Sequence, residues 1–394
     1  MDGDRGGTSG DLVEILRDGR TRTRTELAAM TGQTRATISQ RLDPLQRLGL
    51  VGTAQAQAST GGRPSAAYEF KPEARVVLVA DLGVRHATLA LTDLAGTPIA
   101  TTVIDIQIAD GPDVVMPEVV AAMDQLVASV GSGRTVAGVG VGIPGPVEHS
   151  TGRPTSPPIM PGWDRYDIVE ALSAHYGARI FVDNDANLGA LGEQTVAYPD
   201  LDELLYIRVA SGVGAGIITG GRLVHGVQGA AGDLGHVFSQ AAAGRQCRCG
   251  NTGCVETVAG GIGIAQLLSE AGVRADNADD VTELARAGDL EAIRALRLAG
   301  QALGEVLATC IALLNPRLIA LGGELATAGE SLISGVRQVV FARTLPLASR
   351  DLEVVLAKGG ALGGAIGAAR LVLDNVLDAD SINAEVAALA APVG

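Results

Sequence analysis

The chain has 394 residues, of which 47 % are hydrophobic and 19 % are charged, and its net charge is -14. This length suits two or three domains, and this composition excludes a disordered chain. Residues 1–72 contain ten Arg or Lys and eight Asp or Glu, so the acidic charge belongs to the remainder of the chain. Because an acidic body repels phosphate groups, any contact with nucleic acid has to lie within this first segment.

The sequence shows no signal for a membrane or for secretion. No run of uncharged apolar residues reaches the roughly 18–20 residues that span a bilayer. The first ten residues are polar and rich in glycine, and they lack the apolar region of a signal peptide. We therefore expect a cytoplasmic protein that makes no contact with a membrane.

Three helices are predicted between residues 11 and 50. Thr23, followed three residues later by Glu26, is a capping-box pattern that opens the second, short helix. After a tight turn, Thr34 caps a longer third helix with apolar residues on one side. Pro44 falls inside this third pattern and is expected to kink the helix or to split it in two.

Two strands follow the third helix, one from Leu50 and one over 66–70, with a loop over 59–65 between them. A helix, a tight turn, a helix and a two-stranded wing form a winged helix-turn-helix, whose later helix enters the major groove of DNA. The polar side of that helix and the wing tip carry the candidate DNA contacts Thr34, Arg35, Thr37, Ser39, Gln40, Arg41 and Arg63. A small helical interaction domain with a polar face is the alternative.

From residue 76 onward the pattern is that of an α/β protein. A strand, a polar turn with glycine and a second strand occur near 76–92 and again near 204–220. This repeat predicts a duplicated fold of two lobes with a cleft between them, whereas two hairpins that are alike by chance are the alternative. We expect domains over 1–72, 73–183 and 184–377, with a last helix in 378–394 packing back on the first lobe.

Three of the four cysteines, Cys247, Cys249 and Cys254, lie within eight residues. In a reducing compartment such clustering favours a metal ion over disulfides, and structural zinc takes four ligands. His236, which follows a glycine turn, is the first candidate for the fourth ligand, and His225 is the second. The sequence therefore predicts a closed, structural Zn²⁺ site in the second lobe, with buried free thiols as the alternative.

Several motifs, in their order along the chain, resemble those of the ROK family of repressors and sugar kinases. They are the winged helix-turn-helix, Gly142-Ile143-Pro144-Gly145, Asp183-Asn184-Asp185-Ala186-Asn187, the glycine-rich run 229–236, and the cysteine cluster followed by Glu256. The resemblance covers nearly the whole chain. It implies an α/β, actin-like body of the sugar-kinase and hexokinase type, in which a carbohydrate binds between two lobes.

The resemblance also implies roles for individual residues. Asn184, Asp185, Asp233, His236 and Glu256 match positions that face the sugar, and His236 would serve as a zinc ligand as well. In kinase members, the position of Asp185 supplies the general base, which accepts the proton of the attacked hydroxyl group.

The sequence departs from the family pattern at three places. The first, in the phosphate loop, argues against a kinase, whereas the other two, at Asp233 and Ile159, reduce the sugar contacts and imply either a different carbohydrate or weaker effector binding. The phosphate loop reads Asp81-Leu82-Gly83-Val84-Arg85, without the second glycine and the threonine that let the backbone approach a phosphate. Asp233 stands where sugar-binding members have the longer Glu, and Ile159 stands where a sugar-binding Asn is usual.

We therefore expect a sugar-responsive, DNA-binding transcription regulator, a repressor of carbohydrate-related genes, that is stabilised by zinc and lacks efficient kinase turnover. An ATP-dependent sugar kinase with an appended DNA-binding domain is the alternative. The expected partners are a double-stranded DNA operator, a small sugar effector, and further copies of the chain in a homodimer or homotetramer, because helix-turn-helix proteins usually read two half-sites.

Overall fold

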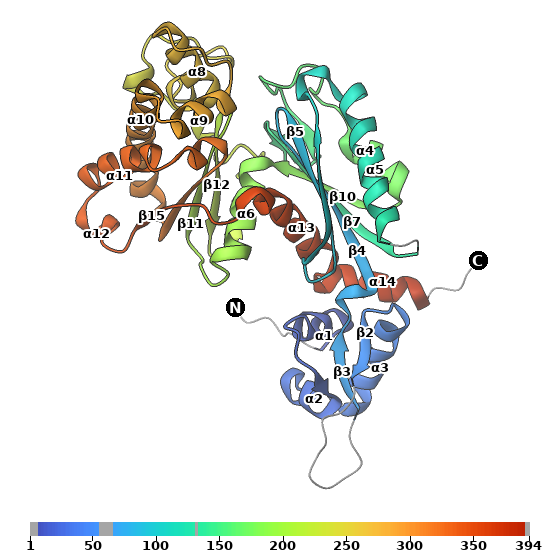
Figure 1. The fold of residues 1–394 in the computed structure, drawn as a ribbon. Coiled ribbons are helices and arrows are strands. Elements are labelled where there is room, and N and C mark those ends of the chain that lie inside the picture. Colours follow the sequence, from blue (N-terminus) through green and yellow to red (C-terminus); the bar gives the residue numbers. More distant parts are fainter. Residues whose placement is uncertain (1–6, 55–65, 131–132, 391–394) are drawn as a thin grey trace.

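The computed structural model describes residues 7–54, 66–130 and 133–390 of the chain. The polypeptide forms a small N-terminal unit and two larger lobes, and the N-terminal unit lies at the end of the first lobe (Figure 1).

The N-terminal unit combines three helices with a three-stranded antiparallel sheet. Its elements are α1 (Ser9–Leu16), β1 (Arg22–Thr23), α2 (Arg24–Thr31), α3 (Arg35–Arg47), β2 (Val51–Ala54) and β3 (Ala67–Phe70), with strand order β1-β3-β2. Capping boxes open α1 and α2, formed by Thr8 with Asp11 and by Thr23 with Glu26, so local sequence satisfies their first amides. This is the predicted winged helix-turn-helix arrangement; the wing tip with Arg63 lies outside the described residues.

Pro44 lies inside α3 without dividing it. The sequence predicted a kink or a split at this proline, and the split is wrong, because one helix runs from Arg35 to Arg47. Pro44 falls in the last turn, where it removes a single hydrogen bond of the helix, and its ring is buried. The third helix therefore remains one element, as its apolar side requires.

The first lobe is a five-stranded mixed sheet. Its strands are β4 (Arg75–Leu82), β5 (His86–Thr92), β6 (Pro98–Asp105), β7 (Thr135–Ile143) and β10 (Arg179–Asn184), in the order β10-β7-β4-β5-β6. Alternate residues of β4 face opposite sides, as in any strand. Val76 and Leu78 join the core beneath helices α4 (Pro112–Ser129) and α5 (Ile168–Tyr176), whereas Val77 and Val79 face the helices between the lobes. A short hairpin of β8 (Val147–Glu148) and β9 (Arg153–Pro154) follows β7.

The second lobe repeats the same topology. Its strands are β11 (Leu204–Val209), β12 (Val213–Thr219), β13 (Arg222–Leu223), β14 (Leu318–Gly322) and β15 (Glu353–Leu356), in the order β13-β12-β11-β14-β15. In each sheet, the first three strands along the chain pair antiparallel. The other two strands lie on the far side of the first strand and run parallel to it. The predicted duplication is confirmed by this shared plan. The helices of this lobe are α7 (Glu256–Ala259), α8 (Gly261–Glu270), α9 (Ala278–Arg286), α10 (Leu290–Leu314), α11 (Ser331–Arg343) and α12 (Pro346–Ser349).

Two helices, α6 (Asp185–Ala197) and α13 (Gly363–Val376), lie against each other between the lobes (Figure 1). Glycine allows this contact, because a Cβ on Gly192 would lie 1.8 Å from the carbonyl oxygen of Gly363. Helix α13 also covers β4 and β7, where Gly140 leaves room for its backbone. The sequence placed α13 within the second lobe, whereas the glycines of β7 let it pack on the sheet of the first.

Helix α14 (Ala379–Ala390) lies between the first lobe and the N-terminal unit (Figure 1). On one side, Gly10 of α1 packs against the backbone of α14, and its amide donates to Asn383 Oδ1 over 3.0 Å. On the other side, Arg75 at the start of β4 pairs with Glu385 at 2.5 Å. The sequence expected this helix to pack back on the first lobe, and the structure gives it a second partner in α1.

Helix α10 is long and apolar enough to cross a membrane, and the segments Gly360–Val376 and Ala379–Leu389 would also qualify if they formed one bent span. Half of the apolar window of α10 is buried within the protein, as in the core helix of a globular lobe.

Candidate functional site

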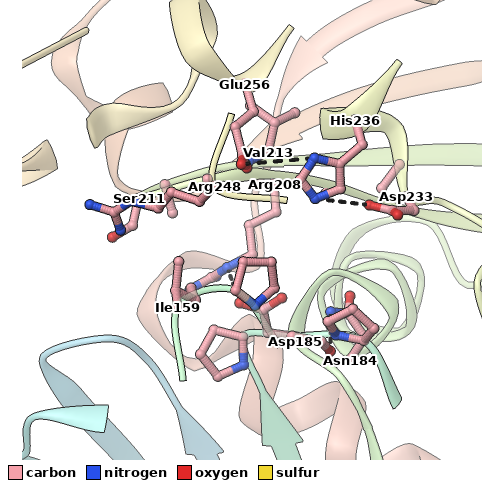
Figure 2. Close-up of a pocket in the computed structure, with 18 of the residues that line it drawn as sticks. Ile159, Asn184, Asp185, Arg208, Ser211, Val213, Asp233, His236, Arg248 and Glu256 are labelled. Carbon is pink, nitrogen blue, oxygen red and sulfur yellow. Dashed lines mark hydrogen bonds and ion pairs between the residues drawn. The ribbon is translucent and has the colours of Figure 1, made fainter. Parts of the chain in front are cut away.

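A cavity of about 210 Å³ lies between the two lobes. The first lobe lines it with non-polar side chains, namely Val84, Pro144, Pro146, Pro158 and Ile159. The second lobe lines it with polar side chains (Figure 2), among them Asp185, Arg208, Asp233, His236, Arg248 and Glu256. A molecule in this cavity therefore meets hydrogen-bonding groups on one side and apolar surface on the other.

Asp185 is the first residue of α6, and its side chain is only 12 % exposed. Burial raises the pKa of Asp185 to about 6, while the guanidinium group of Arg208 acts in the opposite direction. The Nε atom of Arg208 lies 2.8 Å from Asp185 Oδ2 (Figure 2). The carboxylate that the sequence singled out is therefore already ion-paired within the protein.

Arg208 is a cavity residue that the sequence analysis missed. It lies on β11, between Gly214 of β12 and Gly322 of β14, which lack side chains that could crowd it. A charged side chain in an otherwise uncharged, buried strand needs a partner, because an unpaired buried charge is very costly. A single arginine in an apolar strand was therefore the sequence signal that could have identified Arg208 as a site residue.

Asn184 lines the cavity, but its amide group is largely used within the protein. Its Oδ1 accepts from the backbone amide of Ala186 as the N-cap of α6, and its Nδ2 donates to the carbonyl oxygen of Gly145 over 3.0 Å. One Nδ2 hydrogen is left for a ligand. The residue thus joins the start of α6 to the loop after β7, and the sugar contact that the resemblance implies for it stays a prediction.

His225, the second candidate for the metal, has other partners. Its Nε2 lies 2.6 Å from Oδ2 of the buried Asp183, and its ring stacks on that of His149 with centroids 3.8 Å apart. His149 belongs to the loop after β8 in the first lobe, and its amide donates to the carbonyl oxygen of Gln228. These side chains therefore connect the two lobes beside the cavity.

His236 lies between the cavity and the cysteine cluster. Its Nδ1 is 3.6 Å from Cys247 Sγ, whereas its Nε2 is 3.8 Å from Asp233 Oδ1 on the cavity side. Glu256 lies 4.0 Å from His236 Nδ1 and accepts from the backbone amide of Val213. One imidazole can thus bind a metal through Nδ1 and donate to a ligand through Nε2–H.

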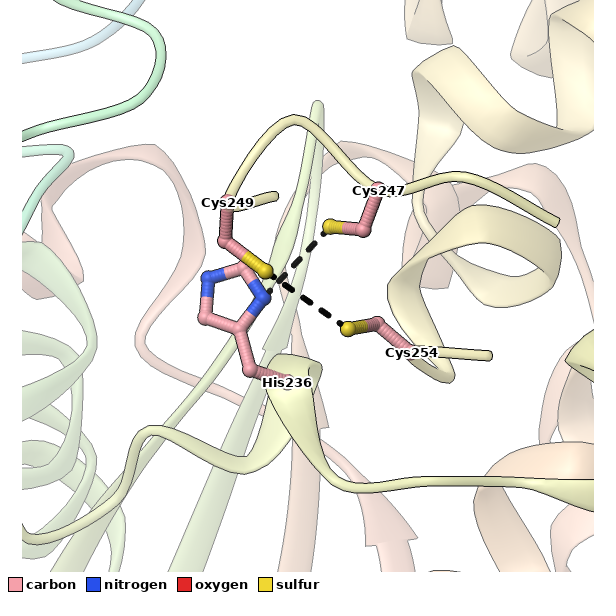
Figure 3. A group of neighbouring side chains, drawn as sticks. All are labelled: His236, Cys247, Cys249 and Cys254. Atoms are coloured by element: carbon pink, nitrogen blue, oxygen red, sulfur yellow. Dashed lines mark hydrogen bonds between the residues drawn. The ribbon is translucent and has the colours of Figure 1, made fainter. Parts of the chain in front are cut away.

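The three cysteines and His236 converge on one point, and their ligand atoms all lie within 4.8 Å of one another (Figure 3). Cys249 Sγ is 3.7 Å from Cys254 Sγ. In a tetrahedral zinc site, bonds of about 2.0–2.3 Å place neighbouring ligand atoms about 3.5–3.8 Å apart. Gly250 and Gly253, with φ of 93° and 88°, let the loop fold back on itself. The cluster is therefore suited to hold a metal ion.

The candidate DNA-binding residues lie on the side of α3 opposite the buried Ile38 and Leu42. The exposed residues are Thr34, Arg35 and Gln40, and the partly exposed ones are Thr37, Ser39 and Arg41. The hydroxyl group of Thr34 caps the helix by accepting from the amide of Thr37. This face is free for contact with a partner within the described part of the chain.

The sequence profile of the ROK family matches residues 77–375, which is most of the two lobes. The chain belongs to the ROK family.

Relatives of this ROK protein include both regulators and kinases. The xylose repressor of Bacillus subtilis is 26 % identical over 369 residues, which cover 93 % of this chain and 94 % of the repressor. The glucokinase of Halalkalibacterium halodurans is 31 % identical over 309 residues, covering 74 % of this chain and 93 % of the glucokinase. A solved ROK family transcriptional regulator, a homologue of the Escherichia coli MLC protein, is 25 % identical with a TM-score of 0.81. It covers 96 % of this chain and 98 % of its own, so the regulators match nearly full length.

The turn after β4 in this ROK protein reaches across to the second lobe. Val84 lines the cavity, and Arg85 Nη1 lies 3.5 Å from Asp279 Oδ2 of α9. A second depression lies at this contact, and its charged lining residues are the carboxylates Asp279, Asp280, Glu283 and Glu324 and the two arginines Arg85 and Arg286. Side chains thus occupy the turn where the family resemblance placed a phosphate loop, and the surrounding carboxylates disfavour a polyphosphate.

Proposed function

We propose that this protein is a DNA-binding transcription repressor whose affinity for its operator is set by a small carbohydrate bound between the lobes. One observation supports this most directly: a winged helix-turn-helix with an exposed polar face on α3 is joined to a ROK body, and regulators match the chain over both parts. The Bacillus subtilis xylose repressor covers 93 % of the chain, whereas the glucokinase covers 74 %.

The operator-contacting surface is the polar face of α3. Arg35 and Gln40 have the side chains that bind guanine and adenine edges in the major groove. Thr34, Thr37, Ser39 and Arg41 flank them, and Arg63 belongs to the wing tip outside the described residues. The chain acts as a homodimer or homotetramer in the cytoplasm, because paired half-sites need paired helices.

The effector is an uncharged sugar. Asp185, Asp233, His236 and Glu256 supply hydrogen bonds from the second lobe, with Asn184 at the edge. The carboxylates that line the cavity, which also include Glu324, outnumber its two arginines, Arg208 and Arg248, so a phosphorylated or acidic sugar is disfavoured. Binding favours one arrangement of the lobes, and α13 and α14 carry that preference to α1.

Zinc is the metal of the cysteine cluster, with Cys247, Cys249, Cys254 and His236 as ligands. Three thiolates and one imidazole at tetrahedral spacing are a preferred set for a structural Zn²⁺ ion, which supplies folding energy and has no open position. Because Cys247 Sγ lies 3.6 Å from Glu256 Oε1, the bound ion also helps to hold in place the polar side chains with which the second lobe lines the cavity.

Sugar phosphorylation is the second candidate function, favoured by the glucokinase relative and by the retained Asp185. We infer that turnover is absent, because the turn after β4 carries Val84 and Arg85 in place of an open phosphate loop. An ATP-coupled assay over a panel of sugars tests this inference, and phosphorylation that is lost in Asp185→Asn would contradict it.

The test of the main proposal is operator binding by purified full-length protein. Fluorescence anisotropy with promoter fragments upstream of its own gene and neighbouring sugar genes should show binding that survives excess bulk DNA at moderate salt. Addition of D-xylose or D-glucose should then weaken it. Equal affinity for all fragments, with and without sugar, would overturn the proposal.

A further inference from the structure

The ion pair of Asp185 with Arg208 sets a chemical constraint on the cavity. The pair joins the start of α6 to β11, and both side chains line the cavity, with exposed fractions of 12 % for Asp185 and 20 % for Arg208. The nearby Asp81 is buried, and its Oδ1 has no hydrogen-bond partner within the described ranges. Burial raises the pKa of Asp81, and the charge of Arg208 acts in the opposite direction.

Two effects act in opposite directions on the proton affinity of Asp185: burial raises its pKa and Arg208 lowers it, and the net pKa is about 6. The cation stabilises the ionised form over the protonated form and so weakens the affinity of Asp185 for a proton. General-base catalysis on a sugar hydroxyl needs that affinity. Arg208 therefore reduces the basicity of Asp185 but does not remove it, and the pair by itself does not exclude phosphoryl transfer.

The same pair is well suited to binding without proton transfer. Asp185 pairs with Arg208 through Oδ2, so its other oxygen, Oδ1, can accept from one hydroxyl group. The Nη groups of Arg208 donate to no side chain or carbonyl in the part of the chain that the structure describes, and Arg208 lines the cavity. One acceptor and one donor side by side complement two adjacent hydroxyl groups of a sugar.

We propose that Arg208 and Asp185 act together as a binding pair, which holds two adjacent hydroxyl groups of the effector. This rests on the proposed function, since it requires a sugar in the cavity. Arg208 is then a specificity-determining residue, because it selects a neutral sugar with a vicinal diol at this position.

Calorimetric titration of the full chain with D-xylose and D-glucose tests the pair. Arg208→Met and Asp185→Asn should each weaken binding of the recognised sugar by about ten-fold or more, as for hydrogen bonds to charged groups. The double variant should be no weaker than the poorer single variant, because the residues act as a unit. Arg317→Met, which breaks the exposed pair with Glu353, is the matched control and should bind as the wild type does.

The pH dependence separates a binding pair from a structural one. The charged groups around Asp185 are Arg208 and Asp81, and Tyr206 and Glu324 also act on Arg208. Between pH 7 and 9 the wild-type affinity should stay flat, whereas in Arg208→Met it should change as Asp185 titrates without its cation. The double variant should again be flat. Loss of affinity in Arg208→Met without any pH dependence would indicate a merely structural role and overturn the proposal.

Analogues of the sugar test the proposal on the unaltered protein, even if a variant fails to fold. Among monodeoxy derivatives of the recognised sugar, removal of either of two adjacent hydroxyl groups should weaken binding about ten-fold. Wild-type affinity in a folded Arg208→Met, or the absence of any adjacent sensitive pair, would overturn the role of Arg208 while the proposed function stands. If neither sugar binds the wild type, the proposed effector fails first.

Discussion

Replacing Gly10 by alanine tests whether α14 connects the body to the N-terminal unit. A Cβ on Gly10 would lie 2.2 Å from the carbonyl oxygen of Ala379 and 2.4 Å from its Cα. Both are backbone atoms that cannot rotate away, and normal contact requires about 3.5 Å. Helices α1 and α14 must therefore move apart by about 1 Å if the alanine is to fit.

The cost follows from the contacts that this movement disturbs. Overpacking costs about 1–3 kcal/mol, and loss of the hydrogen bond from the Gly10 amide to Asn383 costs about 1 kcal/mol more. Ile382 of α14 is fully buried in the apolar cluster that also contains Leu12 and Val13 of α1. We expect Gly10→Ala to lower the free energy of unfolding of the N-terminal unit by about 2–4 kcal/mol.

Urea denaturation with two probes measures this effect. Trp163 is the single tryptophan and lies in the first lobe, so its fluorescence follows the body. Hydrogen exchange of the α1 amides follows the N-terminal unit, and its protection should fall. The sugar-induced release of operator should fall with it, because α14 no longer holds α1 firmly to the body.

A matched substitution controls for the loss of a glycine. Gly363 is the first residue of α13, and a Cβ at this position would meet no atom within 4 Å. The free energy of unfolding of Gly363→Ala should therefore stay within about 0.5 kcal/mol of the wild-type value. Unchanged α1 protection and an unchanged sugar response in Gly10→Ala would refute the contact between α1 and α14.

Three further substitutions test the metal cluster, the operator surface and the histidine stack. Cys249→Ser should abolish stoichiometric zinc in elemental analysis and cost about 4 kcal/mol of stability, whereas Cys310→Ser, outside the cluster, should keep the metal; equal melting with and without zinc would contradict a structural role. Arg35→Ala should weaken specific operator binding by about 1–3 kcal/mol in anisotropy titrations, and an equal loss on every sequence would make Arg35 a phosphate contact instead. Burial, aided by His225, lowers the pKa of His149 from 6.5 while Asp183 opposes this shift, so the unfolded chain binds the proton more readily and stability falls as pH drops through 6.5. His149→Phe keeps a ring on His225 and should reduce that slope in urea titrations at pH 5.5–7.5 by at most about 1.4 kcal/mol per pH unit; an identical slope would rule out His149 as its source.

Local signals in the sequence were sufficient for the elements and for part of the site. The capping box at Thr23, the glycine turns and the apolar periodicity are short-range effects, and they predicted the winged helix-turn-helix and the duplicated lobes. The cysteine cluster could also be recognised, because three of its ligands lie within eight residues and chelation depends on local spacing. The elements of the fold and the metal-binding loop could thus be predicted because their signals lie close together in the sequence.

Long-range contacts depended on the packing of the lobes. His225 was an open candidate for the metal until the tertiary structure placed it on Asp183, 42 residues away. The ion pair of Arg208 with Asp185 could be identified only from the tertiary structure, which places β11 beside the start of α6. The same holds for the hydrogen bond between Gly10 and Asn383, which are 373 residues apart in the sequence. Such pairs leave no periodic trace along the chain, because the free energy that joins them comes from burying whole faces of helices and sheets. The sequence therefore determined which elements form and what chemistry they carry. Only tertiary packing decided which charges meet in the cavity and which helix lies between the first lobe and the N-terminal unit.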